Sequence, residues 1–223
     1  MSNKTIVFDL DDTLYNEVDF LLSAYREISK FLANATGNVI CSDHIYNIME
    51  SFYNNKQNTF REILNYLNLC KISVNDLLYM YKAHVPQIEV HTDVFLVLET
   101  LVQCGFNLGI VTDGRSLQQR NKVSSLGLDK YFENIIISEE FGFEKPNLTN
   151  FSFFENLFPN SSFFYIADNP KKDFIGPNKL GWQTICLLDN GKNIHKQNFD
   201  ISSDYLPNYY VNEVSKILPL IIV

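Results

Sequence analysis

The chain has 223 residues, of which 46% are hydrophobic and 14% aromatic, and its formal net charge at pH 7 is −8. This length and hydrophobic content predict one large packed domain or a core with a smaller insert, and they argue against global disorder. The negative charge argues against a nucleic-acid backbone as the main partner, although a small phosphate could still bind beside a metal ion and a few basic groups.

The first predicted strand, TIVFDL, runs directly into a cluster of carboxylates formed by Asp9, Asp11 and Asp12. Like charges this close repel one another, so an acidic strand end stabilises nothing by itself. Alternation along an extended chain would place Asp9 and Asp11 on the same side. The cluster therefore indicates a site where the carboxylates hold a cation and take part in chemistry.

A helical pattern follows from residue 17 to residue 83. Between residues 15 and 104 the chain has one glycine, Gly37, and one proline, Pro86, and so few helix breakers favour long helices. Apolar residues recur at helical spacing in four runs. These runs contain Leu21, Leu22, Tyr25, Ile28, Phe31 and Leu32; Ile45, Ile48, Met49 and Phe52; Phe60, Ile63, Leu64 and Leu67; and Leu77, Leu78 and Tyr81.

Outside this insert, short apolar runs alternate with helical patterns. The apolar runs are TIVFDL, NLGIVTD, NIIIS, FFYIAD and QTICLLD, and the helical patterns are residues 94–104, 117–126 and 150–157. Strands buried on both faces that alternate with helices imply a parallel sheet with right-handed crossovers. We therefore predict an α/β fold in which residues 1–15 and 87–223 form a Rossmann-like parallel-sheet core. Residues 16–86 form a small four-helix domain inserted into it.

The chain shows no targeting or disulfide pattern. The N-terminus lacks the features of a secretory signal, and no apolar run approaches the roughly 18 residues that span a membrane, so the run KILPLIIV at the C-terminus is predicted to dock on the core. The histidines lack zinc-site spacing, and the cysteines lack a C-x-x-C pair. We expect a cytoplasmic protein with no membrane partner and with buried free thiols. The cysteines are Cys41, Cys70, Cys104 and Cys186.

Polar residues follow several predicted strands of the core. Thr112 and Asp113 end the second strand and Asp168 follows the fourth, and ligand sites in open parallel sheets lie outside the carboxyl ends of the strands. Oxygen-only ligands select Mg²⁺. One carboxylate could attack phosphorus, and a second could protonate the leaving oxygen and then activate water. Lys145, in FEKPN, is the best lysine candidate for binding phosphate oxygens together with backbone N–H groups.

These motifs resemble those of the haloacid dehalogenase-like hydrolases over almost the whole chain. D-L-D-D-T at residues 9–13 is similar to the family's first motif, D-x-D-x-[TV], and the strand ending in Thr112 is similar to the second. Lys145 resembles the third motif, and Asp168 and Asp173, five positions apart, resemble the fourth. The insert looks like the helical cap of the subgroup that carries its cap between the first and second motifs. Such caps close over the site and set the substrate.

The resemblance implies a role for each matching residue. Asp9 would be the nucleophile and a Mg²⁺ ligand, and Asp11 would be the general acid and base with its backbone carbonyl on the metal. Thr112 would hydrogen-bond the transferring phosphoryl group, helped by the backbone N–H groups of Asp113 and Gly114.

The later motifs would complete this site. Lys145 would pair with Asp9 and the phosphate, Asp168 would complete the metal site, and Asp173 would hold the ligand shell or a metal-bound water. Ala167 departs from the glycine of many members, but alanine is also small and should fit.

The function implied is a Mg²⁺-dependent phosphatase that acts on a small phosphorylated metabolite through an aspartyl-phosphate. A phosphomutase would use the same Asp9 and Asp11 and return the phosphoryl group to its substrate. A dehalogenase needs neither Mg²⁺ nor a second acid, so Asp11 argues against it. A non-catalytic binding protein would usually have lost the nucleophile or the lysine. The sequence specifies neither the substrate nor the oligomeric state.

Neighbouring polar residues have simpler interpretations. We predict that Asp12 hydrogen-bonds its own turn, that Lys171 and Lys172 form a surface pair, and that His84 is a structural hinge residue at the exit of the insert.

Overall fold

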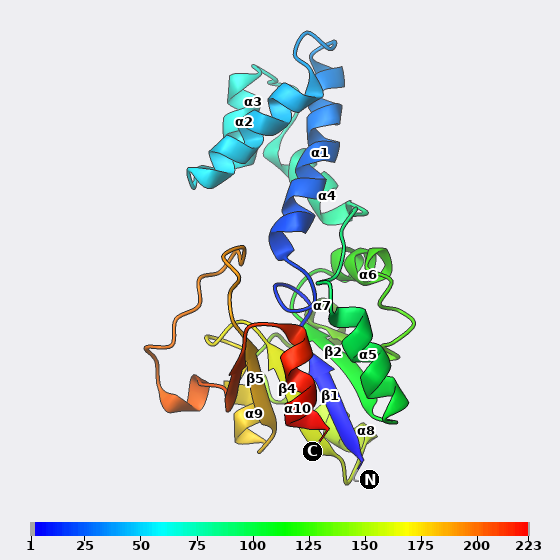
Figure 1. Cartoon of the computed structure of the whole chain (residues 1–223). Coiled ribbons are helices and arrows are strands. Elements are labelled where there is room, and N and C mark those ends of the chain that lie inside the picture. The colour runs from blue at the N-terminus through cyan, green and yellow to red at the C-terminus, as the bar shows by residue number, and fades with distance from the viewer. Residues whose placement is uncertain (1–2, 223) are drawn as a thin grey trace.

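A six-stranded parallel sheet, in the order β3-β2-β1-β4-β5-β6, forms the centre of the computed structural model, which describes residues 3–222 (Figure 1). The strands are β1 (Lys4–Phe8), β2 (Asn107–Thr112), β3 (Asn134–Ile137), β4 (Ser162–Ala167), β5 (Gln183–Leu187) and β6 (Tyr209–Val211). The predicted apolar runs correspond to β1–β5. The sequence interpretation missed β6, because a strand of this length has no periodicity to recognise.

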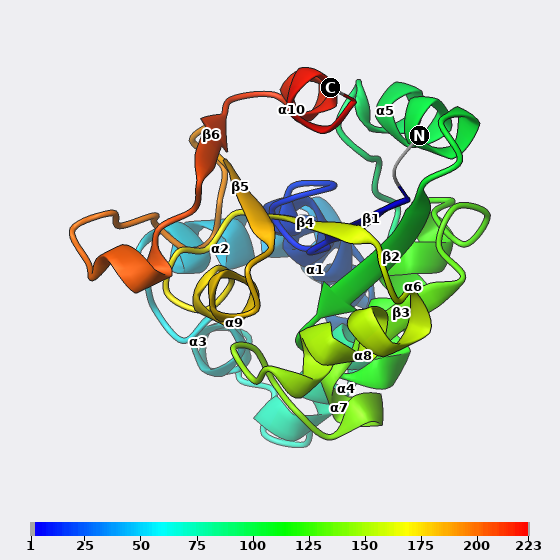
Figure 2. The ribbon, with the colours of Figure 1, turned by 90° about the horizontal axis from the view of Figure 1, so that it is seen from below.

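Both faces of the sheet are covered by helices, as its continuous apolar strands require. Along β1, Ile6 and Phe8 belong to one hydrophobic core and Val7 belongs to the other. Full burial of such an apolar side chain contributes about 1.5–3 kcal/mol to the stability of the folded protein. Figure 2 shows α5 and α10 on one side of the strands and α8 and α9 on the other.

The helices of the first side are α5 (Val94–Gln103), α6 (Ser116–Ser125), the 3-10 helix η2 (Val214–Ile217) and α10 (Leu218–Ile221). The second side carries α8 (Thr149–Leu157) and α9 (Ile175–Lys179), and two short helices, α7 (Ser138–Phe141) and η1 (Ser203–Tyr205), lie in connections. Ile217 and Ile221 are fully buried, so the C-terminal run docks on the core as predicted.

The inserted segment forms α1 (Glu17–Ala35), α2 (Ser42–Asn54), α3 (Thr59–Tyr66) and α4 (Val74–Ala83), which stand beyond the carboxyl end of β1 (Figure 1). These helices pack around their own hydrophobic cluster, which includes Ile28, Met49 and Ile63. Phe31, which the spacing placed in this packing, is instead 38% exposed. As a division into independent domains, the boundaries at 15/16 and 86/87 stay a prediction.

His84 joins the exit of the insert to α1 and to the core. Its Nε2 lies 2.8 Å from Ser23 Oγ, its Nδ1 contacts the Glu27 carboxylate, and the Gln87 N–H donates to Ser23 Oγ at 3.0 Å. On the core side, Asn121 Nδ2 donates to the His84 carbonyl at 3.1 Å. These contacts agree with a structural hinge residue.

The structure also bears on the predictions about membrane helices and cysteines. Among the described residues, no helix has both the length and the apolar character needed to cross a membrane. The cysteines are free as predicted, but only Cys186 is buried, and Cys41 and Cys70 are exposed. The prediction of buried thiols was therefore wrong for both cysteines of the insert, since scattered spacing says nothing about burial.

Candidate active site

The candidate site lies where the order of the strands reverses, at the carboxyl ends of β1 and β4. Each strand is followed by an aspartate, Asp9 after β1 and Asp168 after β4. The Asp9 N–H donates to the Ile166 carbonyl at 2.8 Å, so the two strand ends stay hydrogen-bonded as the chain enters the site. This end of the sheet is the usual ligand position in an open α/β fold.

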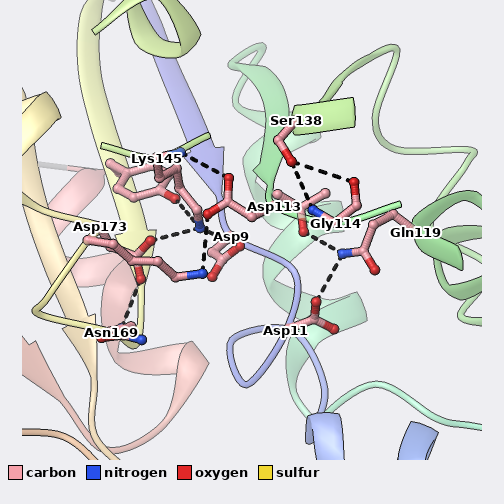
Figure 3. Close-up of polar contacts among 12 residues, drawn as sticks. Asp9, Asp11, Asp113, Gly114, Gln119, Ser138, Lys145, Asn169 and Asp173 are labelled. Carbon is pink, nitrogen blue, oxygen red and sulfur yellow. Dashed lines mark hydrogen bonds and ion pairs between the residues drawn. The ribbon is translucent and has the colours of Figure 1, made fainter. Parts of the chain in front are cut away.

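Lys145 lies at the centre of the site, between two carboxylates (Figure 3). Its side chain is completely buried, and Nζ lies 2.8 Å from Asp9 Oδ1 and 2.7 Å from Asp173 Oδ1. It also donates to the Tyr165 hydroxyl at 3.3 Å. Burial alone would lower the pKa of Lys145, but Asp173 and Asp9 together raise it well above its ordinary value. The ammonium group is therefore charged and paired.

Asp9, Asp168 and Asp173 form an acidic cluster beside Lys145. Each offers a carboxylate oxygen, and these oxygens lie within 4.8 Å of one another. Burial raises the pKa of Asp9 to about 6, and burial together with the Asp173 and Asp9 charges raises the pKa of Asp168 well above its ordinary value. Lys145 alone thus leaves the cluster short of positive charge, and an all-oxygen donor set of this kind fits a hard divalent cation such as Mg²⁺.

The fourth-motif carboxylates are held by neighbouring groups. Asp173 Oδ2 accepts the Asn169 N–H at 2.9 Å, and Asp168 Oδ2 accepts from Asn193 Nδ2 at 2.9 Å. Gln197 Nε2 donates to the Asp168 carbonyl at 2.7 Å. The loop after β5 therefore orients a candidate metal ligand. The sequence interpretation missed Asn193 and Gln197 because they belong to no motif.

Asp11 makes contacts quite different from those of Asp9. Its Oδ1 accepts from Tyr15 Oη at 2.5 Å and from Lys122 Nζ at 2.7 Å, and its Oδ2 accepts from Gln119 Nε2 at 2.9 Å. Burial opposes ionisation, but Lys122 and these hydrogen bonds lower the pKa of Asp11 below its ordinary value. β1 ends at Phe8 and the chain turns after Leu10, so the placement of Asp9 and Asp11 on the same side stays a prediction. Asp11 is also absent from the carboxylate cluster, and its carbonyl as a metal ligand stays a prediction.

The second motif lies beside these acids. Thr112 Oγ1 accepts from Gln119 Nε2 at 2.6 Å, which leaves the Thr112 hydroxyl proton available to a phosphate. The Gly114 N–H, predicted to bind phosphate, already donates to Ser138 Oγ at 3.0 Å. The Asp113 carboxylate accepts the Lys145 backbone N–H at 2.9 Å and so helps to fix the backbone position of Lys145.

Nearby charged residues partly follow the predictions. Asp12 has a left-handed φ of 55° and accepts the Glu17 N–H at 2.8 Å, which confirms that it hydrogen-bonds its turn. Lys171 is exposed as predicted, but Lys172 is only partly so: its side chain is 36% exposed, and its Nζ lies 3.3 Å from Asp113 Oδ2. The site thus includes a second lysine, which the sequence interpretation assigned to solvent.

Known proteins are similar to this chain in sequence. A sequence model described as haloacid dehalogenase-like hydrolase matches residues 6–187. A glyceraldehyde 3-phosphate phosphatase of Methanocaldococcus jannaschii is 27% identical over 227 residues, which cover 98% of this chain and 96% of that protein. The chain therefore belongs to the haloacid dehalogenase-like hydrolases.

Solved structures share the fold. The structure of YfnB from Bacillus subtilis, crystallised bound to magnesium, aligns with 100% of this chain over 100% of its own chain, with a TM-score of 0.59 and 20% identity. A 2-haloacid dehalogenase from Pseudomonas syringae covers 99% of this chain and 98% of its own, with a TM-score of 0.63 and 20% identity. Because proteins with different chemistry share this fold, the reaction has to be argued from the side chains of the site.

Proposed function

We propose that this protein is a Mg²⁺-dependent phosphatase that hydrolyses a small phosphomonoester through an aspartyl-phosphate on Asp9. The observation that carries the proposal is the buried contact of Lys145 with Asp9 beside the carboxylates of Asp168 and Asp173. A nucleophilic carboxylate must be ionised and must approach an anionic phosphate. That approach requires positive charge beside both groups; Lys145 supplies part of it, and a bound Mg²⁺ would supply the rest.

In the first half of the reaction, an Asp9 carboxylate oxygen attacks phosphorus while Lys145 and Thr112 bind the phosphoryl oxygens. Lys122 favours the ionised form of Asp11, so Asp11 must first take up a proton, which it then gives to the leaving oxygen so that the alcohol departs neutral. In the second half, Asp11 takes a proton from the attacking water, and inorganic phosphate leaves Asp9 free.

Asp9 and Asp168, with the Asp11 carbonyl, are the proposed ligands of Mg²⁺, which when bound supplies charge that offsets the phosphate. The helices α1–α4 are proposed to act as the cap that closes over the substrate.

The relatives support this proposal in two ways. The Methanocaldococcus jannaschii relative is named for a three-carbon phosphate, glyceraldehyde 3-phosphate, so a small phosphorylated aldehyde or sugar is the first substrate class to test. The Bacillus subtilis neighbour was solved with magnesium. Asp11 also favours phosphate over halogenated substrates, because displacement of a halide needs no general acid.

The test is phosphate release from a panel that includes glyceraldehyde 3-phosphate, other sugar phosphates and nucleotides, with Mg²⁺ and with EDTA. We expect release with Mg²⁺ and its loss with EDTA. A free-phosphate assay separates a phosphatase from a phosphomutase, since a mutase returns the phosphoryl group to its substrate.

Asp9→Asn should abolish phosphate release, by roughly 10³-fold or more, because the amide is a poor nucleophile. The exposed Asp129→Asn is the matched control and should retain activity. Equal activity in Asp9→Asn and wild type, at equal folded fraction, would exclude the aspartyl-phosphate.

A further inference from the structure

Lys122 is a buried cation that no motif accounts for. It lies on α6, near the end of the helix, and only 1% of the residue is exposed. Lysines are almost never buried this completely unless they are paired, because removing the ammonium group from water is costly. The groups that pair with Lys122 therefore indicate why it is buried.

Those partners are Asp11 and the first residues of α1. Lys122 Nζ lies 2.7 Å from Asp11 Oδ1 and 3.9 Å from Glu17 Oε1, and it lies 4.7 Å from the centre of the Phe20 ring. Lys122 thus links α6 of the core, Asp11 and the start of the insert.

Gln119, one turn earlier on α6, binds the other oxygen of the same carboxylate. Its Nε2 lies 2.9 Å from Asp11 Oδ2 and 2.6 Å from Thr112 Oγ1, and the residue is 1% exposed (Figure 3). Residues three apart on a helix point the same way, so one face of α6 holds both oxygens of Asp11. Gln119 also couples Asp11 to Thr112, the proposed phosphate-binding hydroxyl.

We propose that Lys122 and Gln119 are positioning residues for the reaction: they hold the Asp11 carboxylate in the orientation from which it exchanges a proton with the leaving oxygen and with water. This inference rests on the proposed phosphatase function. A general acid works only within hydrogen-bond reach of the reacting oxygen, and a misplacement of about 1 Å costs up to roughly 10²-fold in rate. Without Lys122 and Gln119, the Tyr15 hydroxyl would be the one remaining side-chain donor described for the Asp11 carboxylate, which could then turn about its side-chain bonds.

Lys122→Met removes the ammonium group and keeps the apolar stem. We expect kcat for phosphate release to fall roughly 10- to 10²-fold while KM changes less than about twofold, because the substrate phosphate is bound by other residues. Lys122→Arg, which keeps the charge, should recover part of kcat. Arg120→Met on the same helix removes only the partly exposed pair with Glu140 and should leave kcat within about twofold.

A double-mutant cycle separates positioning from a purely structural role. If Lys122 acts through Asp11, then Lys122→Met in an Asp11→Asn background should cost no further rate, whereas Asp11→Asn alone costs roughly 10²–10⁴-fold. Gln119→Leu keeps the buried ion pair and gives a second probe, with a similar predicted fall in kcat; because it also removes the bond to Thr112, its KM is not used as a criterion. Rates are compared at equal folded fraction, measured by circular dichroism.

The outcomes distinguish this inference from the function on which it rests. If the wild type releases phosphate and kcat is unchanged in both Lys122→Met and Gln119→Leu, the inference is wrong while the proposed function stands. An equal loss from Lys122→Met with and without Asp11 also overturns the inference. A wild-type protein that releases no phosphate from any ester overturns the proposed function first, and the inference with it.

Discussion

At the scale of single residues, the site is built around buried charge. Lys145 has no access to solvent and contacts Asp9 and Asp173 at 2.8 and 2.7 Å. A buried ion pair gains little net stability from its own attraction, but removing one partner leaves an uncompensated charge in a medium that solvates it poorly. We therefore expect Lys145 to be needed both for the stability of the fold and for the proposed chemistry.

Lys145→Met should lower the free energy of unfolding by about 3–5 kcal/mol at neutral pH in EDTA, because Asp9 and Asp173 lose their common counter-charge. Urea unfolding followed by circular dichroism measures this change. The exposed Lys71→Met serves as the control and should stay within about 0.5 kcal/mol of wild type. A Lys145→Met protein as stable as its control would show that the two carboxylates do not need the lysine.

At the scale of elements, the connections of α1–α4 to the core are tied by specific hydrogen bonds. Ser23 on α1 accepts the Gln87 N–H at 3.0 Å and lies 2.8 Å from His84 Nε2. Because a carboxylate only accepts, His84 Nδ1 donates to Glu27. The exit segment is thus fastened to the helix by which the chain enters the insert.

Ser23→Ala should destabilise the protein by about 1–3 kcal/mol, because it removes the partner of both His84 Nε2 and the Gln87 N–H in a partly buried place. The exposed Ser51→Ala on α2 is a matched substitution and should cost less than about 0.5 kcal/mol. Hydrogen exchange at the Gln87 amide gives a local readout. Unchanged protection in Ser23→Ala would mean that the hydroxyl does not hold the exit segment.

At the scale of the whole molecule, strand order assembles the acidic cluster. β1 and β4 pair side by side although the helical insert and two other strands separate them in the chain. Their pairing places Asp9 near Asp168, and burial together with the charges of neighbouring acids raises the pKa of both carboxyl groups. The folded protein should therefore bind a divalent cation more tightly than the unfolded chain, in which these acids are far apart.

Mg²⁺ should stabilise the fold by linkage, with about 2.7 kcal/mol gained when the free concentration reaches 100 times Kd. We expect the Tm of the wild type to rise with MgCl₂ beyond the effect of NaCl at matched ionic strength. Asp168→Asn should reduce this rise, whereas the exposed Asp129→Asn should preserve it. Equal Mg²⁺ shifts in wild type and Asp168→Asn would place the cation elsewhere.

The sequence by itself determined the α/β class, the five longer strands and the helical nature of residues 17–83. It could do so because burial repeats with the period of each element, so the pattern can be read locally. It also named Asp9, Lys145, Asp168 and Asp173, which lie together in the structure. Their catalytic roles stay predictions.

Only the tertiary structure decided which groups hold Asp11. Lys122 is 111 positions away from it in the chain and Gln119 is 108 positions away. The same holds for Asn193 against Asp168 and for the engaged N–H of Gly114. A polar helix such as α6 reads as a solvated surface, and its buried face appears only when the sheet brings it against the turn after β1. The local sequence pattern indicates which face of a segment is buried. The contacts of each side chain depend on packing between segments that are far apart in the sequence.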